Sequence, residues 1–163
     1  MYDFQTGDPA LDTWMLLRQT WEAMSRAMEK EFRKVGATTA QVDVLSVLKN
    51  SPVPMSGAEI GRWLFREPQT IVGLLNRMER KGLIRRVRDP KNRKIVTIEI
   101  TEKGEELYKE AAAIGLIERV MSSLSDKQRS HLMHRLRVLR ATVLQEIGRE
   151  VIRPPATVAH KSG

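Results

Sequence analysis

The part of the sequence that most constrains the fold is residues 56–101, which begin with two helical patterns in close succession. Ser56 and Glu59 have the spacing of a capping box, in which each side chain satisfies a free backbone N–H group at the start of a helix. A second pattern extends from about residue 67 to residue 81, and Gly82 suits the left-handed position that ends a helix. Two short helices in succession predict the scaffold of a helix-turn-helix.

Two β-prone stretches follow these helices, at residues 83–88 and 94–100. Residues 89–93 join them and are rich in turn formers. In the second stretch, apolar residues alternate with Thr97 and Glu99, so one face should pack on the helices while the other meets solvent. Helix, helix and hairpin in this order predict a mainly α-helical chain with a small β-hairpin wing, which is a winged helix-turn-helix.

The net charge of the chain is concentrated in the same segment. Residues 62–94 contain 11 lysine and arginine residues against three acidic residues, whereas the rest of the chain carries 17 of each sign. The whole formal charge of +8 therefore lies in about one fifth of the length. Like charges repel one another unless a polyanion binds them. The sequence thus favours nucleic acid or an anionic membrane surface as the partner over acidic small molecules alone.

Composition and motifs exclude several classes of protein. The chain of 163 residues has no cysteine, which excludes disulfides, cysteine-ligated zinc and thiol-based redox sensing. It has no run of about 18 apolar residues and no export signal, so we expect a cytoplasmic protein. No phosphate-binding glycine loop, nucleophile elbow or HExxH pattern occurs, so we expect no enzyme, no catalytic residues and no cofactor. His131 and His134 are spaced for a metal but lack further ligands, so we expect no metal site.

A long amphipathic helix is predicted before the winged segment. Asp8 and Pro9 are typical of a helix start, and a continuous apolar stripe follows them until Gly36 ends it. A capping box, Thr38 with Gln41, opens the next helix. The first helix is longer than a small domain needs for its own core, so part of its stripe should pack against another chain.

Two more helices are expected after the hairpin. Residues 102–123 should form one helix capped by Thr101, and residues 126–147 a second helix opened by the capping box of Ser125 with Gln128. The last helix could form an intertwined dimer interface with the first, and a dimer is what a reader of two DNA half-sites requires. The expected dimerisation residues are Leu11, Trp14, Leu132, Leu136, Leu139 and Val143.

The chain should therefore divide into functional regions. Residues 1–36 and 102–148 are expected to serve dimerisation, and residues 37–101 to form the DNA-binding lobe. Residues 149–163 are rich in proline and small polar residues, which favours a disordered tail. The tryptophans Trp14, Trp21 and Trp63 are expected to be core residues rather than a platform for a ligand.

The predicted helix at residues 67–81 has two different faces. Its apolar residues recur at i, i+3, i+4 and i+7 and should be buried. They are Ile71, Leu74, Leu75 and Met78. The opposite face is polar and basic, as a helix in a major groove should be. It carries Gln69, Thr70, Gly73, Asn76, Arg77 and Arg80. Gly73 is unfavourable in a helix by about 1 kcal/mol relative to Ala. It either permits a close approach to DNA or has no function.

The order of these patterns resembles the MarR family of bacterial transcription regulators over roughly residues 10–147. The most specific part is residues 79–104. They contain counterparts of the family's LExxGLIxR, of its wing Asp with an Arg four residues on, and of its LTxxG, with Ile100 in place of the usual Leu. The resemblance implies a homodimer on a palindromic double-stranded DNA, with the fourth helix in the major groove and Arg93 in the minor groove. In many members, a small aromatic or lipophilic anion binds between the DNA-binding lobe and the dimer helices and weakens DNA binding.

The resemblance also implies roles for single residues. Bases are expected to be read by Pro68, Gln69, Thr70 and Gly73, and a phosphate to be held by Arg77. Many members have a larger polar or basic residue in place of Gly73. The expected DNA-binding residues are Pro68, Gln69, Thr70, Gly73, Asn76, Arg77, Arg86, Arg88, Lys91 and Arg93. A salt bridge between Asp89 and Arg93 should aim the arginine at the wing tip. The predicted function is a sequence-specific transcriptional regulator, most simply a repressor. The alternative is a protein-interaction or adaptor module on the same scaffold.

Overall fold

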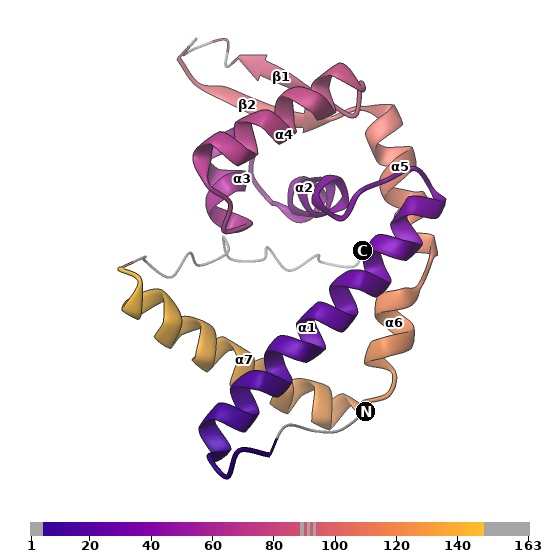
Figure 1. Cartoon of the computed structure of the whole chain (residues 1–163). Coiled ribbons are helices and arrows are strands. Elements are labelled where there is room, and N and C mark those ends of the chain that lie inside the picture. Colours follow the sequence, from indigo (N-terminus) through magenta and orange to yellow (C-terminus); the bar gives the residue numbers. More distant parts are fainter. Residues whose placement is uncertain (1–4, 89, 91, 93, 149–163) are drawn as a thin grey trace, which may run out of the picture.

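The computed structural model describes residues 5–88, 90, 92 and 94–148. In chain order its elements are α1 (Pro9–Lys34), α2 (Thr39–Asn50), α3 (Gly57–Trp63), α4 (Pro68–Arg80), β1 (Ile84–Arg88), β2 (Val96–Ile100), α5 (Glu102–Ala113), α6 (Leu116–Met121) and α7 (Asp126–Glu146). Figure 1 shows α2, α3, α4 and the hairpin gathered into a lobe, while α1 and α7 extend away from it. The predicted fold, mainly helical with a two-stranded wing, is confirmed.

The helices begin at the predicted capping residues. The Asp8 carboxylate accepts hydrogen bonds from the backbone N–H groups of Ala10 at 2.9 Å and Leu11 at 3.3 Å, and these donors have no partner within α1. The helices α2, α3 and α7 begin with reciprocal capping boxes. The pairs are Thr38 with Gln41, Ser56 with Glu59, and Ser125 with Gln128. Each of these predictions is confirmed.

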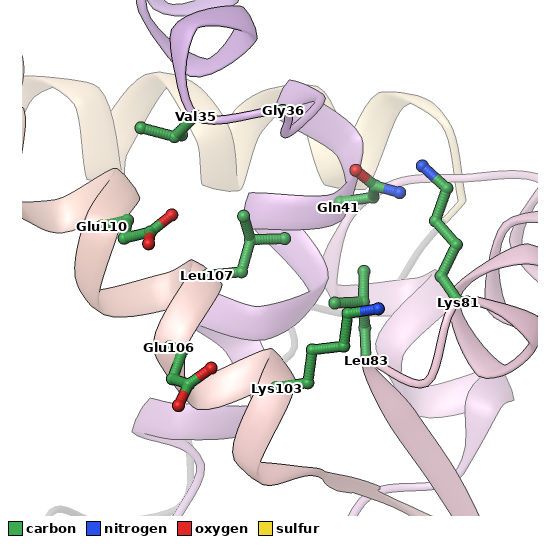
Figure 2. A pocket seen from close by; sticks show the side chains of 9 residues that line it. All are labelled: Val35, Gly36, Gln41, Lys81, Leu83, Lys103, Glu106, Leu107 and Glu110. Atoms are coloured by element: carbon green, nitrogen blue, oxygen red, sulfur yellow. The ribbon is translucent and has the colours of Figure 1, made fainter.

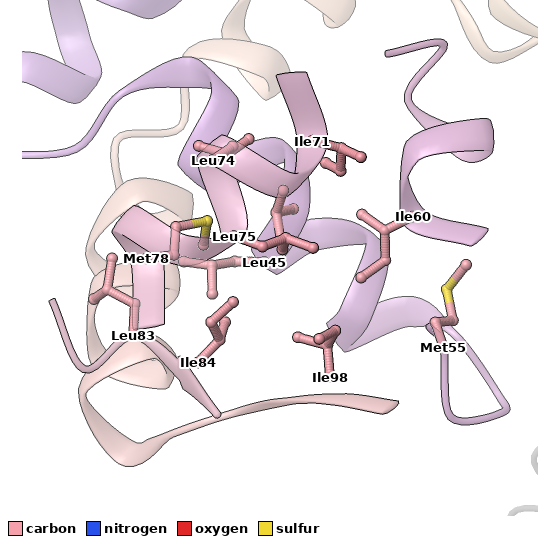
Figure 3. Close-up of a cluster of buried hydrophobic side chains, with 11 residues drawn as sticks. Leu45, Met55, Ile60, Ile71, Leu74, Leu75, Met78, Leu83, Ile84 and Ile98 are labelled. Carbon is pink, nitrogen blue, oxygen red and sulfur yellow. The ribbon is translucent and has the colours of Figure 1, made fainter. Parts of the chain in front are cut away.

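The lobe has an apolar core between α2, α3, α4 and the hairpin (Figure 3). The buried residues of this core are Val44, Leu45, Met55, Ile60, Ile71, Leu74, Leu75, Met78, Leu83, Ile84 and Ile98. Burying each large apolar side chain contributes about 1.5–3 kcal/mol. The predicted buried face of α4 is confirmed, and it holds α4 against α2 and α3 so that the opposite face points outward.

A smaller cluster joins the long helices to the lobe. Phe32 at the end of α1 packs with Ala37, with Val42 of α2 and with Ala111 of α5. Because these four residues are buried together, the end of α1 and the middle of α5 are fixed relative to the lobe.

The hairpin pairs β1 with β2 in antiparallel register, so that Ile84 lies opposite Ile100 and Arg88 opposite Val96. A further hydrogen bond, from Ile98 N to Met55 O at 2.8 Å, ties the outer edge of β2 to the segment before α3. The first turn of α5 lies directly on the start of β1. A Cβ atom at Gly104 would be 2.1 Å from the Leu83 carbonyl oxygen, so this close approach requires glycine.

The structure corrects the prediction of a single helix over residues 102–123. α5 ends at Ala113, and α6 begins only after Gly115, which has a φ of 64°. Glycine adopts this left-handed conformation without the steric penalty that other residues meet, and it is a weak helix former. The chain therefore bends between α5 and α6.

Much of the apolar stripe on α1 and α7 is exposed. All the predicted dimerisation residues are at least 40% exposed, among them Trp14 at 59% and Leu139 at 48%. The prediction that the tryptophans are core residues is wrong for this chain, since Trp21 and Trp63 are also exposed. The described part of the chain therefore leaves these three side chains largely uncovered.

No helix among the described residues combines the length and the apolar character needed to cross a membrane.

Candidate nucleic-acid interface

The outward face of α4 is the centre of the candidate interface. Pro68 occupies the first turn, where its missing N–H group is no loss, and Glu67 precedes it as the N-cap residue without a side-chain cap. Of the predicted contact residues on α4, Pro68, Gln69, Thr70, Asn76 and Arg77 are exposed and Gly73 is half-buried. The structure thus brings these side chains to one surface. Their contacts with DNA stay predictions.

Among the described residues, none packs closely against Gly73. A Cβ atom added there would meet only the Arg77 guanidinium at 3.5 Å, which is an ordinary van der Waals distance. Gly61 differs, because its added Cβ would lie 3.0 Å from Ile71 Cγ2 where α3 crosses α4. Close packing against the described part of the chain therefore does not explain why glycine, which is unfavourable in a helix, occupies position 73.

Two exposed apolar residues next to this face were not identified from the sequence. Val72 of α4 is 52% exposed, and it is the one aliphatic side chain of that helix left outside the core. Phe65, in the turn between α3 and α4, is 49% exposed and has a φ of 52°, a conformation that is strained for an aromatic residue. Val72 does not belong to the i, i+3, i+4, i+7 repeat of the four buried residues. This spacing alone would have predicted that its side chain is exposed.

The arginines of β1 point to different sides of the hairpin. Arg85 donates two hydrogen bonds to the Glu99 carboxylate on β2, at 2.9 and 2.7 Å. Arg86 lies on the same face of the strand as buried Ile84 and therefore reaches α4. There it is bound by Glu79 and Asn76, so two of the predicted DNA-contact residues contact each other.

The wing extends from Arg88, which is exposed at the end of β1. The predicted wing residues Asp89, Lys91 and Arg93, and with them the predicted salt bridge of Asp89 with Arg93, lie outside the described residues. The tail at residues 149–163 lies outside them too.

A cavity of about 480 Å³ lies between the lobe and α5 (Figure 2). Figure 2 shows the nitrogen ends of Gln41, Lys81 and Lys103 on one side of this cavity, and the carboxylates of Glu106 and Glu110 on the other. Leu83, Leu107, Val35 and Gly36 complete the lining. Among the described residues, neither lysine forms an ion pair. The cavity therefore offers apolar surface with unpaired positive charge on one side and two carboxylates on the other.

A second cavity of about 420 Å³ lies between α1 and the start of α2. Trp21, Asp43 and Arg66 are among the residues that line it. Burial raises the pKa of the Asp43 carboxyl, and the positive charge of Arg66 opposes this rise. The Thr39 hydroxyl oxygen, also at this cavity, is buried without a hydrogen-bond partner in the described part of the chain.

Comparison with known proteins agrees with this geometry. Residues 38–104 match the family described as a winged helix DNA-binding domain. The transcriptional repressor MdtR of Bacillus subtilis is 25% identical over 125 residues, which cover 76% of this chain and 80% of that protein. Two solved structures share the fold with a TM-score of 0.70 each. They are the DNA complex of MepR from S. aureus, at 21% identity over 78% of this chain and 94% of that chain, and a MarR family transcription regulator, at 19% identity over 89% and 96%.

The lobe, its outward basic face and the match over residues 38–104 define the class: the chain is a winged-helix DNA-binding protein. Within that class, the chain is a transcription regulator, and the resemblance over residues 79–104 together with the relatives above supports the MarR type.

Proposed function

We propose that the chain is a homodimeric repressor that recognises a palindromic operator through α4 and the wing. The observation that carries this proposal is the coincidence of the outward polar face of α4 with the whole excess positive charge of the chain. The major groove presents a distinct pattern of donors and acceptors for each base pair, which amide and hydroxyl side chains such as Gln69 and Thr70 can read. The lobe at residues 37–101 reads DNA in this proposal, and residues 1–36 and 102–148 form the dimer.

Selection of duplexes from a random DNA library by the purified protein, at two salt concentrations, tests DNA recognition. We expect a two-fold symmetric motif whose half-sites are about one helical turn apart, roughly 10 bp. Affinity should fall steeply with salt, with a log-log slope of about 0.9 for each neutralised phosphate. Retention of DNA without any motif, lost at the higher salt, would contradict sequence-specific recognition and favour an adaptor role.

The dimer is supported by the apolar surface of α1 and α7. Trp14 on α1 and Leu136, Leu139 and Val143 on α7 are exposed in one chain. Extensive exposed apolar surface usually marks an interaction site. A second copy of the chain would cover these side chains. Sedimentation equilibrium should give the mass of a dimer for the wild type and of a monomer for Leu136→Asp. A wild-type chain that remains a monomer at all concentrations would contradict the proposal.

A small anionic ligand of the cavity in Figure 2 would make the repressor releasable. Lys81 is the C-cap residue of α4 and Lys103 belongs to α5, so a carboxylate bound by both would act directly on the position of the DNA-reading helix. The apolar side chains of Leu83 and Leu107 suit an aromatic or aliphatic body.

Fluorescence anisotropy of a selected duplex tests this ligand site, with small aromatic carboxylates compared against their neutral amides. The carboxylates should raise the Kd of the duplex by about 5- to 150-fold, the usual range of coupling between two sites. Lys103→Gln should weaken the response to carboxylates while leaving DNA binding without ligand intact. An equal response to the neutral amides would contradict the assignment of the anion to this cavity.

A further inference from the structure

Arg86 is held by two side chains of α4, the helix on which the proposed DNA recognition depends. Its Nη2 donates to the Asn76 amide oxygen at 2.7 Å, and its Nη1 donates to one oxygen of the Glu79 carboxylate. The backbone N–H of Arg86 donates to the other carboxylate oxygen at 3.2 Å. The strand is thus joined to the last two turns of α4 by three hydrogen bonds, two of them from the planar guanidinium fork.

The alternation of side chains along β1 explains why Arg86 reaches α4. Ile84 is buried in the lobe core, so Arg86, two residues further on, lies on the same helix-facing side of the hairpin. Arg85 lies on the other face and pairs with Glu99, its cross-strand neighbour. Arg85 therefore links two strands of the wing, whereas Arg86 links the wing to the helix.

The pair of Arg86 with Glu79 also has an electrostatic effect. Glu79 is the single acidic residue in the sequence of α4, and an unpaired carboxylate there would repel DNA phosphates. The Arg86 and Glu79 side chains are 32% and 38% exposed, so the pair is partly shielded from solvent. Arg86 neutralises Glu79 while Glu79 holds Arg86 in place.

We propose that Arg86 is a positioning residue for DNA binding, which sets the wing at a fixed angle to α4 through Glu79 and Asn76. This inference rests on the proposed function, and it gives Arg86 a role other than the direct DNA contact predicted from the sequence. In the proposed function, α4 and the wing contact the same DNA duplex at the same time. Fixing their relative orientation before binding removes part of the entropic cost of ordering them on DNA.

Glu79→Gln separates this role from simple electrostatics because the two predict opposite signs. Removing a carboxylate from a DNA-binding surface should tighten binding if charge alone matters. Loss of the link should instead weaken binding about tenfold, a size typical of residues in one hydrogen-bonded network. Arg86→Lys keeps the positive charge but loses the fork, so it should weaken binding to a similar extent.

Glu99→Gln is the matched control. Like Glu79→Gln, it removes one carboxylate and breaks an arginine pair. This pair joins β1 to β2 and does not involve α4. Its affinity should be unchanged or slightly higher. All variants are compared by anisotropy on a duplex selected by the wild type, over a salt series, at a temperature where circular dichroism shows each to be fully folded.

The expected result is weaker binding by Glu79→Gln and Arg86→Lys, with an unchanged log-log salt slope. A direct phosphate contact of Arg86 would instead leave Glu79→Gln at or above wild-type affinity, and this result overturns the proposal. Equal losses in Glu79→Gln and Glu99→Gln would overturn it too. If Glu79→Gln does not fold, Glu79→Asp, which keeps the charge and shortens the reach, replaces it with the same expectation.

The proposed function and the positioning role fail in different ways. If the wild type selects no DNA motif, the proposed function is wrong and the positioning role is wrong with it. If the wild type selects a motif that Glu79→Gln binds as tightly, only the positioning role of Arg86 is wrong.

Discussion

The lobe and the two long helices carry similar apolar repeats, but they use them differently. In the lobe, Leu45 and Leu75 are at most 1% exposed. The apolar residues of α4 pack against those of α2, α3 and the hairpin. On α1 and α7, Trp14 and Leu136 are 59% and 40% exposed. An apolar repeat therefore shows that a helix has a face to bury, and it leaves open whether that face is buried in the same chain or against another. The following predictions test this difference.

Truncation of a leucine should separate the two regions most clearly. Leu45→Ala removes a side chain with no exposed area, so it should lower the free energy of unfolding by about 2–5 kcal/mol at any protein concentration. Urea denaturation followed by circular dichroism measures this change.

Leu136→Ala is the comparison in α7. It should have little effect on a dilute, monomeric sample, because the side chain is 40% exposed there. Its effect should appear only at concentrations where the chain self-associates, since stability is then linked to assembly. Equal losses for both variants at all concentrations would remove the distinction between the regions.

The joint between the lobe and α5 should be sensitive to one added methyl group. Gly104→Ala places a Cβ against the Leu83 carbonyl oxygen, and it should destabilise the chain by about 1–3 kcal/mol, the usual range for overpacking. Gly73→Ala makes the same change in α4, where the space is open, and should stabilise the helix by up to about 1 kcal/mol. Thermal unfolding of both variants decides between these outcomes.

The Gly73→Ala variant also tests the DNA-binding surface. Weaker operator binding in a more stable protein would support a close approach of α4 to DNA at this position. Unchanged binding with raised stability would show that Gly73 has no role in recognition.

Val72 offers a smaller test of which groups α4 reads. An exposed aliphatic side chain on a major-groove helix can contact the methyl group of thymine. Replacing single thymines of the selected duplex by deoxyuridine should weaken wild-type binding at one position by about 0.8 kcal/mol, the value of one buried methylene. With Val72→Ala, the same replacement should have almost no effect. Equal losses in both proteins would show that Val72 does not contact that methyl group.

The carboxyl of Asp43 should produce the smallest and most pH-dependent effect. Its pKa is raised in the folded chain by burial, so its contribution to stability is present at acidic pH and is lost as the pH rises through the folded pKa. Asp43→Asn should therefore stabilise the protein at neutral pH, and the gain should vanish on acidification. Urea denaturation at several pH values measures it.

Glu59 provides a control of opposite sign. Two hydrogen bonds from Ser56 lower the pKa of the Glu59 carboxyl. The bond from the backbone N–H has the larger effect, and the bond from the hydroxyl has the smaller one. Its contribution to stability is therefore present at neutral pH and is lost as the pH falls through the folded pKa. Glu59→Gln should destabilise the protein near neutral pH and approach wild-type stability in acid. Parallel pH profiles for the two variants would contradict both assignments.

Much of the local structure follows from the sequence by itself. The capping boxes at Thr38, Ser56 and Ser125 and the buried repeat of α4 depend on residues within one or two helical turns. Such short-range interactions can be recognised without knowing what lies across the fold. The charge concentrated in residues 62–94 indicated a polyanionic partner, and the helix, helix and hairpin order favoured DNA over a membrane surface.

Tertiary structure decided what depends on residues far apart in the chain. Arg86 was expected to contact DNA, and only the packing of β1 against α4 showed that Glu79 and Asn76 hold it. The exposure of Trp14 and Trp21 likewise depended on which surfaces α1 meets, and no repeat in the sequence specifies this. Sequence determines local hydrogen bonds and the presence of an apolar face, whereas the partner of that face, and of each exposed charge, is set by how the elements pack.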